Sequence, residues 1–298
     1  MAGLLFITDL HITTTCSSRV DDPLSTIVRK LEWCLSFCES RGIPLVLGGD
    51  VFDTPTVSFE AYNAVYAVLK RFSHGVYVVW GNHDMLYRSR ENVRKCSLYA
   101  LIQSGVVREL HAGEDVVFGG LFRLTCRLPL QTCSIPQVLV YHGFLNQRDG
   151  DFTVDVTDLV GCESLSLVLL GHDHTKYDDL QLSSNVIVVR PGSFYRNRRD
   201  ASCRRQVYGV WVDAGVSGIR HTLVEVPAGT PDEVFASKSS DSLVAVDVVN
   251  YDALLTSLRE STGSEDMTFV EALSSVAPKE VVSYCEGLVS SVNVIKQK

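Results

Sequence analysis

Short apolar runs rich in β-branched residues recur along this chain, and each ends in a polar or glycine-rich segment. A run of this kind predicts a buried β-strand. Five runs are the clearest, and they cover residues 4–7, 45–47, 76–80, 138–140 and 167–170.

Segments with helical spacing of apolar residues follow the first three runs. They predict helices over residues 24–38, 59–72 and 92–103. Asp21 and Asp22, ahead of Pro23, provide a start for the first helix. This alternation of strands and helices predicts a largely parallel sheet that is covered by helices.

The middle of the chain is richer in strand-like runs and has few helices between them. These runs cover residues 116–126, 138–141, 165–170, 186–190, 207–212 and 219–226. We therefore expect a second, mixed sheet packed on the first. The predicted fold class is α/β, a two-sheet β-sandwich flanked by helices.

A change of composition divides the chain near its end. The segment from Pro227 to Asp241 contains Pro-Ala-Gly-Thr-Pro and then Ser-Lys-Ser-Ser-Asp, so residues 229–241 predict a linker between a main domain (1–228) and a small α+β C-terminal module (242–298). Within that module, residues 243–249 predict a strand, and residues 251–259, 269–272 and 279–289 predict helices. A module of this size is too small to be expected to fold alone.

Polar clusters follow the five strand-like runs. They are Asp9-Leu10-His11, Gly49-Asp50-Val51-Phe52-Asp53, Gly81-Asn82-His83-Asp84, Tyr141-His142-Gly143 and Gly171-His172-Asp173-His174. A single His near a strand end is more often a structural residue. Five of the chain's eight His, however, fall within these clusters. Ligands bind at the carboxyl ends of strands in open α/β sheets, so this coincidence predicts a metal site.

The residue types fit two cations. Asp9 and His11 can bind one ion, Asp50 can bridge two, and Asn82 offers a neutral carbonyl oxygen. His172 and His174 can each face one ion, and His142 completes the second. Carboxylate, imidazole and amide ligands suit Mn²⁺, Fe²⁺ or Zn²⁺, and we expect two divalent ions with Mn²⁺ first and Mg²⁺ as a further alternative. Such a pair, ~3.5–4 Å apart, activates water as a hydroxide for in-line attack on phosphorus.

Three further residues in the clusters have predicted roles beside the metals. His83 follows Asn82 and is expected to protonate the leaving group. Asp84 is expected to hydrogen-bond to the His83 imidazole. Asp53 is expected to orient a metal ligand, with a turn cap at Thr54-Pro55 as the alternative.

Charge and cysteine content set outer bounds on function. A net charge of −8 and a pI near 5.5 argue against a general nucleic-acid binder. Basic residues gather, however, within 190–205 and within 88–95, next to site-forming strand ends.

Cys34 and Cys38 lack a matching zinc-site pair, so we interpret them as buried apolar residues. Reduced thiols indicate an intracellular, cytoplasmic protein. No apolar stretch reaches the ~20 residues of a membrane helix, so no membrane partner is expected.

The set of motifs, D-x-H, G-D-x-x-D, G-N-H-D, H-G and G-H-x-H, resembles the calcineurin-like metallophosphoesterase superfamily over residues 3–194. The resemblance implies a double β-sandwich and a catalytic domain over 1–228. It also implies that Asp50 is shared between the two metals and that His83 is the catalytic acid. One implied ligand set is Asp9, His11, Asp50 and His174, and the other is Asp50, Asn82, His142 and His172.

Within that superfamily the chain is similar to the SbcD-type DNA repair and recombination nucleases. The similar features are the segment Gly-Asp-Val-Phe-Asp-Thr, the segment Arg-Pro-Gly-Ser-Phe-Tyr-Arg at 190–196, and the small C-terminal module. This resemblance implies a Mn²⁺-dependent DNA exonuclease or endonuclease of recombination, repair or phage DNA metabolism, in a bacterium or a phage-infected cell. It makes Ser193, Tyr195 and Arg196 candidate phosphate contacts, and it leaves an SbcC-type ATPase subunit and a second copy of the chain open as partners besides DNA.

Two other functions remain open. A phosphomonoesterase or a cyclic-nucleotide phosphodiesterase could use the same fold, and the acidic pI favours that interpretation. A non-catalytic scaffold or nucleic-acid-binding protein would be expected to have lost metal ligands, whereas all seven predicted ligands are present.

Overall fold

The computed structural model describes residues 2–111, 113–146, 152–196, 206–215 and 218–235. The chain divides into two compact units, residues 1–236 and 237–298. The predicted C-terminal module at 242–298 and residues 236–241 of the predicted linker lie outside the described residues.

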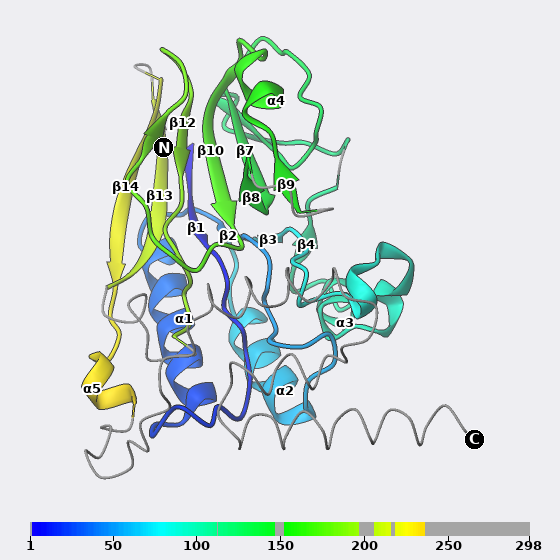
Figure 1. Ribbon diagram of the computed structural model, residues 1–298, viewed down its shortest axis with the longest axis vertical. Coiled ribbons are helices and arrows are strands. Elements are labelled where there is room, and N and C mark those ends of the chain that lie inside the picture. The colour runs from blue at the N-terminus through cyan, green and yellow to red at the C-terminus, as the bar shows by residue number, and fades with distance from the viewer. Residues whose placement is uncertain (1, 112, 147–151, 197–205, 216–217, 236–298) are drawn as a thin grey trace, which may run out of the picture. The chain divides into compact units, whose positions relative to one another are not determined.

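The first sheet has six strands in the order β14-β13-β1-β2-β3-β4 (Figure 1). Strands β1 to β4 are parallel, and β13 and β14 add an antiparallel edge next to β1. Their bounds are β1 Ala2–Ile7, β2 Leu45–Leu47, β3 Val76–Val78, β4 Arg108–Glu109, β13 Val207–Gly215 and β14 Gly218–Val226.

The second sheet also has six strands, in the order β11-β12-β10-β7-β6-β5. Its centre is parallel and both edge pairings are antiparallel, so this sheet is mixed, as predicted. The strands are β5 Val116–Phe118, β6 Phe122–Thr125, β7 Gln137–His142, β10 Leu165–Gly171, β11 Leu180–Gln181 and β12 Ile187–Val189. Strands β8 (Phe144–Leu145) and β9 (Thr153–Val154) form a separate pair. The predicted two-sheet α/β architecture is confirmed.

Helices α1 (Pro23–Glu39) and α2 (Phe59–Leu69) lie side by side and pack on the first sheet (Figure 1). The Asp22 carboxylate caps α1 by accepting hydrogen bonds from the backbone N–H groups of Leu24 and Ser25, which confirms the predicted start. The other helices of the described residues are η1 (Leu86–Arg88), η2 (Arg90–Lys95), α3 (Ser97–Gln103), α4 (Val156–Val160) and α5 (Pro231–Val234).

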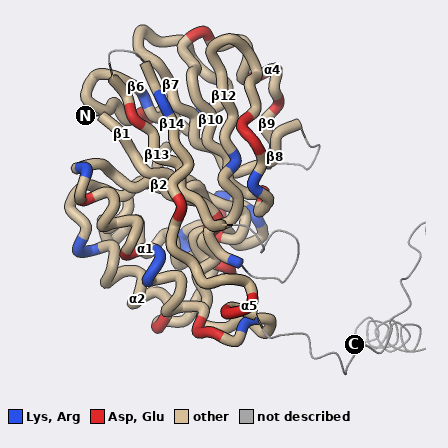
Figure 2. The backbone as a smooth tube through the Cα atoms, turned by 90° about the vertical axis from the view of Figure 1, so that its left-hand side faces the viewer, with Lys and Arg blue, Asp and Glu red and all other residues tan. Residues whose placement is uncertain are grey.

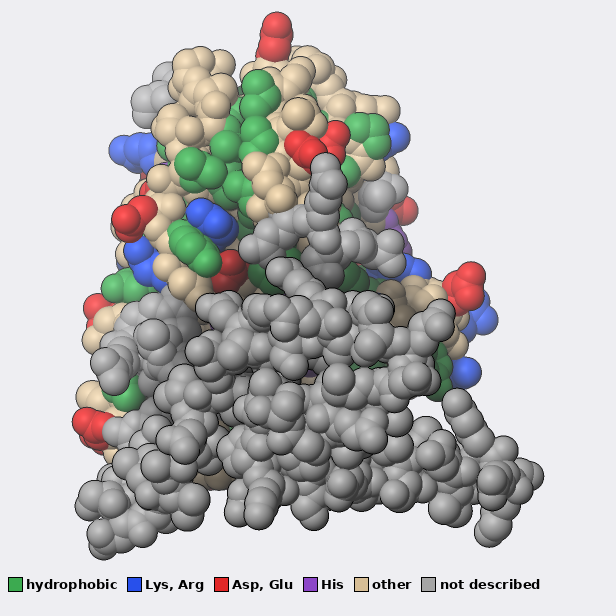
Figure 3. Space-filling view, in the orientation of Figure 1, with side chains coloured by type: hydrophobic (Ala, Val, Ile, Leu, Met, Phe, Trp, Pro, Cys, Tyr) green, Lys and Arg blue, Asp and Glu red, His purple; other side chains and the backbone are tan. Residues whose placement is uncertain are grey.

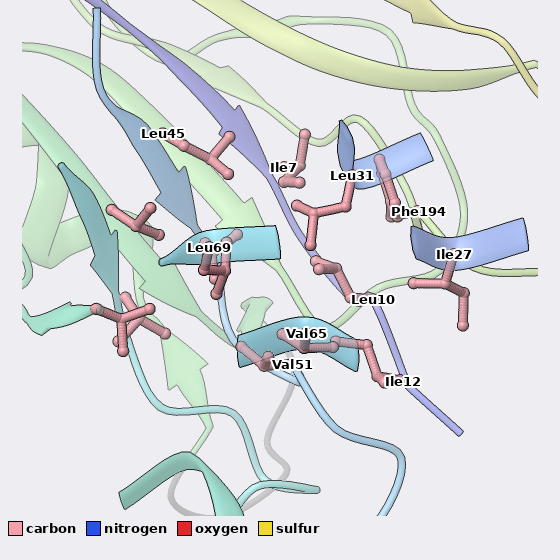
Figure 4. Close-up of a cluster of buried hydrophobic side chains, with 14 of the residues drawn as sticks. Ile7, Leu10, Ile12, Ile27, Leu31, Leu45, Val51, Val65, Leu69 and Phe194 are labelled. Carbon is pink, nitrogen blue, oxygen red and sulfur yellow. The ribbon is translucent and has the colours of Figure 1, made fainter. Parts of the chain in front are cut away.

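The core has layers on both sides of each sheet. Between the first sheet and its helices, Ile7 and Leu45 of the strands meet Leu31 of α1 and Leu69 of α2 (Figure 4). Each fully buried side chain of this size contributes roughly 1.5–3 kcal/mol. A second cluster, which includes Phe6 and Phe122, joins the two sheets, and a third lies between the second sheet and α4.

The structure differs from the predicted elements in three places. The predicted helix over 92–103 is a 3₁₀ segment followed by α3, and the two are separated at Cys96, which is extended. The predicted strand over 116–126 is a hairpin, because Gly119 and Gly120 both adopt positive φ. Strands β13 and β14 belong to the first sheet rather than the second, since β13 pairs with β1.

The described part of the predicted linker contains ordered structure. Thr230 and Glu233 form a capping box at the start of α5, and Val234 and Phe235 are buried. Arg19 pairs with Phe235 through a β-bridge. Residues 229–235 therefore pack against the segment before α1.

Charges of both signs are intermixed on the backbone trace of α1 and α2 (Figure 2) and along the edges of the surface shown in Figure 3. Cys34 and Cys38 are fully buried in the helix-facing core, as predicted. Among the described residues, no helix combines the length and the apolarity needed to cross a bilayer.

Candidate metal centre

The predicted ligands come from loops at the carboxyl ends of β1, β2 and β3 in the first sheet and of β7 and β10 in the second. Backbone hydrogen bonds tie these loops together. The N–H of Asp9 donates to Gly49 at 3.1 Å, and the N–H of Gly143 donates to Gly171 at 3.2 Å. Side chains from both sheets therefore reach one region, as the strand-end pattern predicted.

A first group of ligand atoms comes from Asp9, His11 and His174, and these atoms lie within 4.8 Å of one another. The Nε2 atoms of His11 and His174 are 2.9 Å apart. Asp9 Oδ1 is 3.9 Å from His11 Nε2 and 3.6 Å from His174 Nε2. The three side chains surround a space of the size that one cation requires.

Asp50, His142 and His172 form a second group. Their ligand atoms also lie within 4.8 Å of one another. His142 Nε2 is 3.3 Å from Asp50 Oδ2 and 3.1 Å from Asn82 Oδ1. The seven predicted ligands therefore lie close together, six of them in the two groups and Asn82 beside His142.

Asp50 lies between the two groups. Its Oδ2 atom is 3.8 Å from His11 Nε2 and 3.3 Å from His142 Nε2. Its other oxygen accepts a hydrogen bond from the backbone N–H of His83 at 2.8 Å, which holds the carboxylate in this orientation.

Four of these residues have a left-handed backbone, with φ values of 55° for Asp9, 43° for His11, 47° for Asp50 and 86° for His172. Such conformations are uncommon for residues other than glycine and cluster at functional sites. They turn the chain sharply at the strand ends, so that side chains two residues apart face the same region.

Close glycine packing brings the ligand loops together. An ideal Cβ on Gly81 would lie 2.1 Å from both the backbone N and the Oδ1 of Asp50. One on Gly171 would lie 2.1 Å from Thr8 Oγ1 and 2.5 Å from the Gly48 carbonyl. Only glycine permits this approach.

The hydrogen bonding of His142 fits a cation. Its Nδ1 lies 2.8 Å from the carbonyl oxygen of Gly48 and must donate the hydrogen there. The Nε2 lone pair of the neutral ring then faces two oxygen atoms, of Asn82 and Asp50, which are themselves acceptors. Such an arrangement requires a positive charge, either a proton or a metal ion.

The electrostatics agree with this interpretation. Burial alone would lower the pKa of His142, but the Asp50 carboxylate raises it to about 9. Burial also opposes ionisation of Asp50, yet His142 and His11 hold the pKa of that carboxyl well below its usual range. Burial and the nearby His142 lower the pKa of His172 to about 4, which leaves a neutral imidazole able to bind a metal.

Residues 3–176 match the family model described as calcineurin-like phosphoesterase. The chain belongs to this family. Family membership and the two clusters of His and Asp together make this phosphoesterase a metal-dependent hydrolase with a divalent-metal site.

Comparison with solved structures gives distant similarities. The protein TT1561 of Thermus thermophilus is 12% identical with a TM-score of 0.45, and the match covers 74% of this chain and 98% of that chain. NAD nucleotidase of Haemophilus influenzae is 12% identical with a TM-score of 0.42, and the match covers 75% of this chain and 49% of that chain. A search of curated proteins finds no match.

His83 of the phosphoesterase is exposed beside the two groups. Its ring centroid is 4.7 Å from that of His11, and its Nδ1 lies 2.7 Å from the Asp53 carbonyl oxygen. The carbonyl accepts, so Nδ1 carries the hydrogen and Nε2 is left for proton transfer. The Asp53 side chain lies beside His11 rather than His83. Its Oδ1 atom is 3.2 Å from His11 Nδ1, where a carboxylate can orient the imidazole of a metal ligand.

The predicted hydrogen bond from Asp84 to the His83 imidazole is wrong. The Asp84 carboxylate is fully buried and accepts hydrogen bonds from the backbone N–H groups of Val51, Phe52 and Gly81. Burial and the neighbouring Asp50 raise the pKa of Asp84 to about 7. Asp84 thus ties the loop after β2 to the loop after β3, and its role is to position them.

The candidate phosphate contacts Ser193, Tyr195 and Arg196 face the protein. The Ser193 hydroxyl donates to the backbone carbonyl groups of Asp9 and Tyr195. Tyr195 is 2% exposed and Arg196 is 8% exposed, and the Arg196 guanidinium donates to the Gly229 carbonyl. Phosphate binding by these residues stays a prediction, and their observed contacts support the loop beneath Asp9.

One residue at the site was not singled out from the sequence. The Thr8 hydroxyl lies 2.7 Å from Asp9 Oδ2 and 3.0 Å from the Gly48 carbonyl, and the residue is 1% exposed. Its position directly before Asp9, at the end of a strand, is the only sequence signal that could have indicated this role.

Proposed function

We propose that this phosphoesterase is a Mn²⁺-dependent phosphodiesterase that cleaves DNA, as an exonuclease or endonuclease of recombination, repair or phage DNA metabolism. The observation that carries the proposal is the position of Asp50, between one group of Asp9, His11 and His174 and another of His142 and His172. Two bound ions would supply a nucleophile from water at neutral pH and positive charge for the phosphoryl oxygens.

The residues of the chain have distinct roles in this proposal. Asp9, His11 and His174 would hold one ion, Asn82, His142 and His172 would hold the other, and Asp50 would be within reach of either. Asp53 keeps the His11 ring oriented through Nδ1.

His83 acts on the leaving group in this scheme. In the imidazolium form of its ring, the Asp53 carbonyl accepts from Nδ1–H, and the exposed Nε2–H gives its proton to the departing oxygen, which leaves a neutral ring. Its backbone N–H holds Asp50, so one residue contacts the shared carboxylate and also faces the substrate.

The preference for a diester of DNA rests on basic residues close to the site. Arg88 and Arg90 line a cavity that His142 also lines. Guanidinium groups there can bind the phosphates that flank the cleaved bond. An SbcC-type ATPase subunit and a homodimer stay predictions.

A phosphomonoesterase or cyclic-nucleotide phosphodiesterase is the second candidate, because the net charge of −8 is unfavourable for a DNA-binding protein. The two are separated by an assay of end-labelled single- and double-stranded DNA, p-nitrophenyl phosphate and a 3′,5′-cyclic nucleotide, each with Mn²⁺, Mg²⁺ or EDTA. We expect DNA cleavage with Mn²⁺ and none with EDTA. Turnover of the monoester or the cyclic nucleotide while DNA stays intact would refute the nuclease.

A further inference from the structure

A cavity of about 560 Å³ adjoins the second metal group, and the His142 side chain forms part of its wall. This volume is within the range of small-ligand sites, which is about 300–1,000 Å³. The other walls of the cavity include the loop after β3, η1 and η2, and the end of β7.

The walls are aromatic. Trp80, Tyr87, Tyr141 and Phe152 all line the cavity. Aromatic side chains accept the flat face of any base, so stacking on them does not depend on the sequence. The cavity therefore suits a planar ring rather than a purely polar group.

The aromatic residues of the wall differ in burial. Trp80 is 6% exposed and Tyr87 is 88% exposed, so the surface available for stacking runs from the interior to the rim of the cavity.

The rim of the cavity carries Arg88, Arg90 and Glu91, and its backbone is strained. Tyr87 and Arg88 are consecutive residues with φ values of 56° and 53°. Strain of this kind clusters at ligand sites. The Arg90 guanidinium lies 5.5 Å from the centre of the Trp80 ring and 3.0 Å from the Glu109 carboxylate, which balances its charge.

We propose that this cavity is a nucleoside subsite, which takes the base of a nucleotide whose phosphate lies at the metal centre. The base stacks on the aromatic wall, while Arg88 lies beside its phosphate. This inference rests on the proposed phosphoesterase function and specifies its substrate class as nucleoside phosphoesters.

The first test compares two substrates with the same leaving group, thymidine 5′-(p-nitrophenyl phosphate) and methyl p-nitrophenyl phosphate, under Mn²⁺. The readout is the ratio of their kcat/KM values in the full chain. We expect Tyr87→Ala to lower this ratio about tenfold, mainly through KM of the thymidine ester. The matched control is Phe59→Ala, another exposed aromatic residue (86% exposed) that does not line the cavity, and it should leave the ratio unchanged.

The second test needs no metal. Thymidine is added to the EDTA-treated chain, and tryptophan fluorescence is followed. Saturable quenching is expected in the wild type and in Phe59→Ala, with an affinity about tenfold weaker in Tyr87→Ala. Trp33 and Trp211 are outside the cavity, and both lie against Phe37.

The two tests separate failure of the subsite from failure of the proposed function. Thymidine binding with neither ester hydrolysed would refute the phosphoesterase and support the subsite. The opposite result is that both esters are hydrolysed with the same ratio of kcat/KM values in Tyr87→Ala and in wild type, while thymidine does not quench the tryptophan fluorescence. That result would refute the subsite and leave the phosphoesterase function standing.

A final arm identifies the source of the nucleoside. A labelled single strand that carries one abasic residue is compared with the intact strand. Reduced cleavage at the abasic position supports the subsite with a nucleic-acid strand as the source. Another outcome is that both strands stay intact while the thymidine ester is hydrolysed, and more slowly in Tyr87→Ala. That outcome supports the subsite and identifies free nucleotides as the source of the nucleoside. Equal cleavage at abasic and intact positions counts against the subsite.

Discussion

Lys30 is buried on α1, where its amine donates to a backbone carbonyl, and its protonation should make the stability of the fold depend on pH. The residue is 2% exposed, and the carbonyl that its Nζ contacts belongs to Phe194. Burial, together with the nearby charges of Arg19 and Arg196, lowers the pKa of Lys30 from 10.5 to about 7.

The sign of the effect follows from these two pKa values. Above pH 10.5 the amine is neutral in both states. As the pH falls from 10.5 to about 7, the unfolded chain binds a proton at Lys30 that the folded chain does not, so the free energy of unfolding decreases. At ~1.4 kcal/mol per pH unit the loss is on the order of 5 kcal/mol, and below pH 7 it is constant.

Lys30→Met removes this dependence while keeping a long apolar side chain. The hydrogen bond to Phe194 is lost as well, at about 1–2 kcal/mol. We expect the variant to be more stable than wild type at pH 7 by roughly 3–4 kcal/mol, and its advantage to fall as the pH is raised to 10.

Urea unfolding of the full chain at pH 7, 8, 9 and 10 provides the measurement. The control is Lys70→Met at the exposed C-cap of α2, whose stability should follow the wild type across this range. Parallel pH curves for Lys30→Met and wild type would show that the amine keeps its charge in the folded state, and would refute the reasoning.

The remaining predictions concern the metal centre. Asp50→Ala should remove both ions, measured as metal per chain after dialysis; a full complement would contradict its shared position. His83→Ala should retain metal while kcat falls by about 10²–10⁴, and loss of metal would show that its role is different. Gly81→Ala should displace Asp50, since its Cβ would lie 2.1 Å from Asp50 atoms, and should lower metal content in a folded protein. Gly161→Ala, whose Cβ meets nothing within 4 Å, should keep both metal and activity; equal losses in the two glycine variants would refute the steric argument.

The strand-end pattern was sufficient to predict which loops carry the ligands, because strand direction and burial follow from local residue types. Asp22 similarly indicated the start of α1, since capping depends only on near neighbours. The placement of β13 beside β1 was not predictable in this way. It pairs residues about 200 positions apart, such as Leu4 with Val212, and no local pattern records that choice.

The contacts of Asp84 and His83 show a second limit. Adjacency in sequence suggested a pair, but the Asp84 carboxylate points to backbone N–H groups, and His83 hydrogen-bonds to the backbone carbonyl of Asp53. Backbone donors and acceptors are the same in every residue, so a sequence does not show where they gather. The cavity beside His142 was missed for a related reason, because its aromatic walls come from separate segments.

The position of the metal centre has a mechanical consequence. Each ligand group takes side chains from both sheets: Asp9 and His11 with His174 in one, Asp50 with His142 and His172 in the other. Within the described residues the two sheets share no backbone ladder, so bound ions would act as cross-links over the seam between them. Chelation should then loosen the sandwich as well as stop turnover, and amide exchange at that seam should quicken before any helix melts.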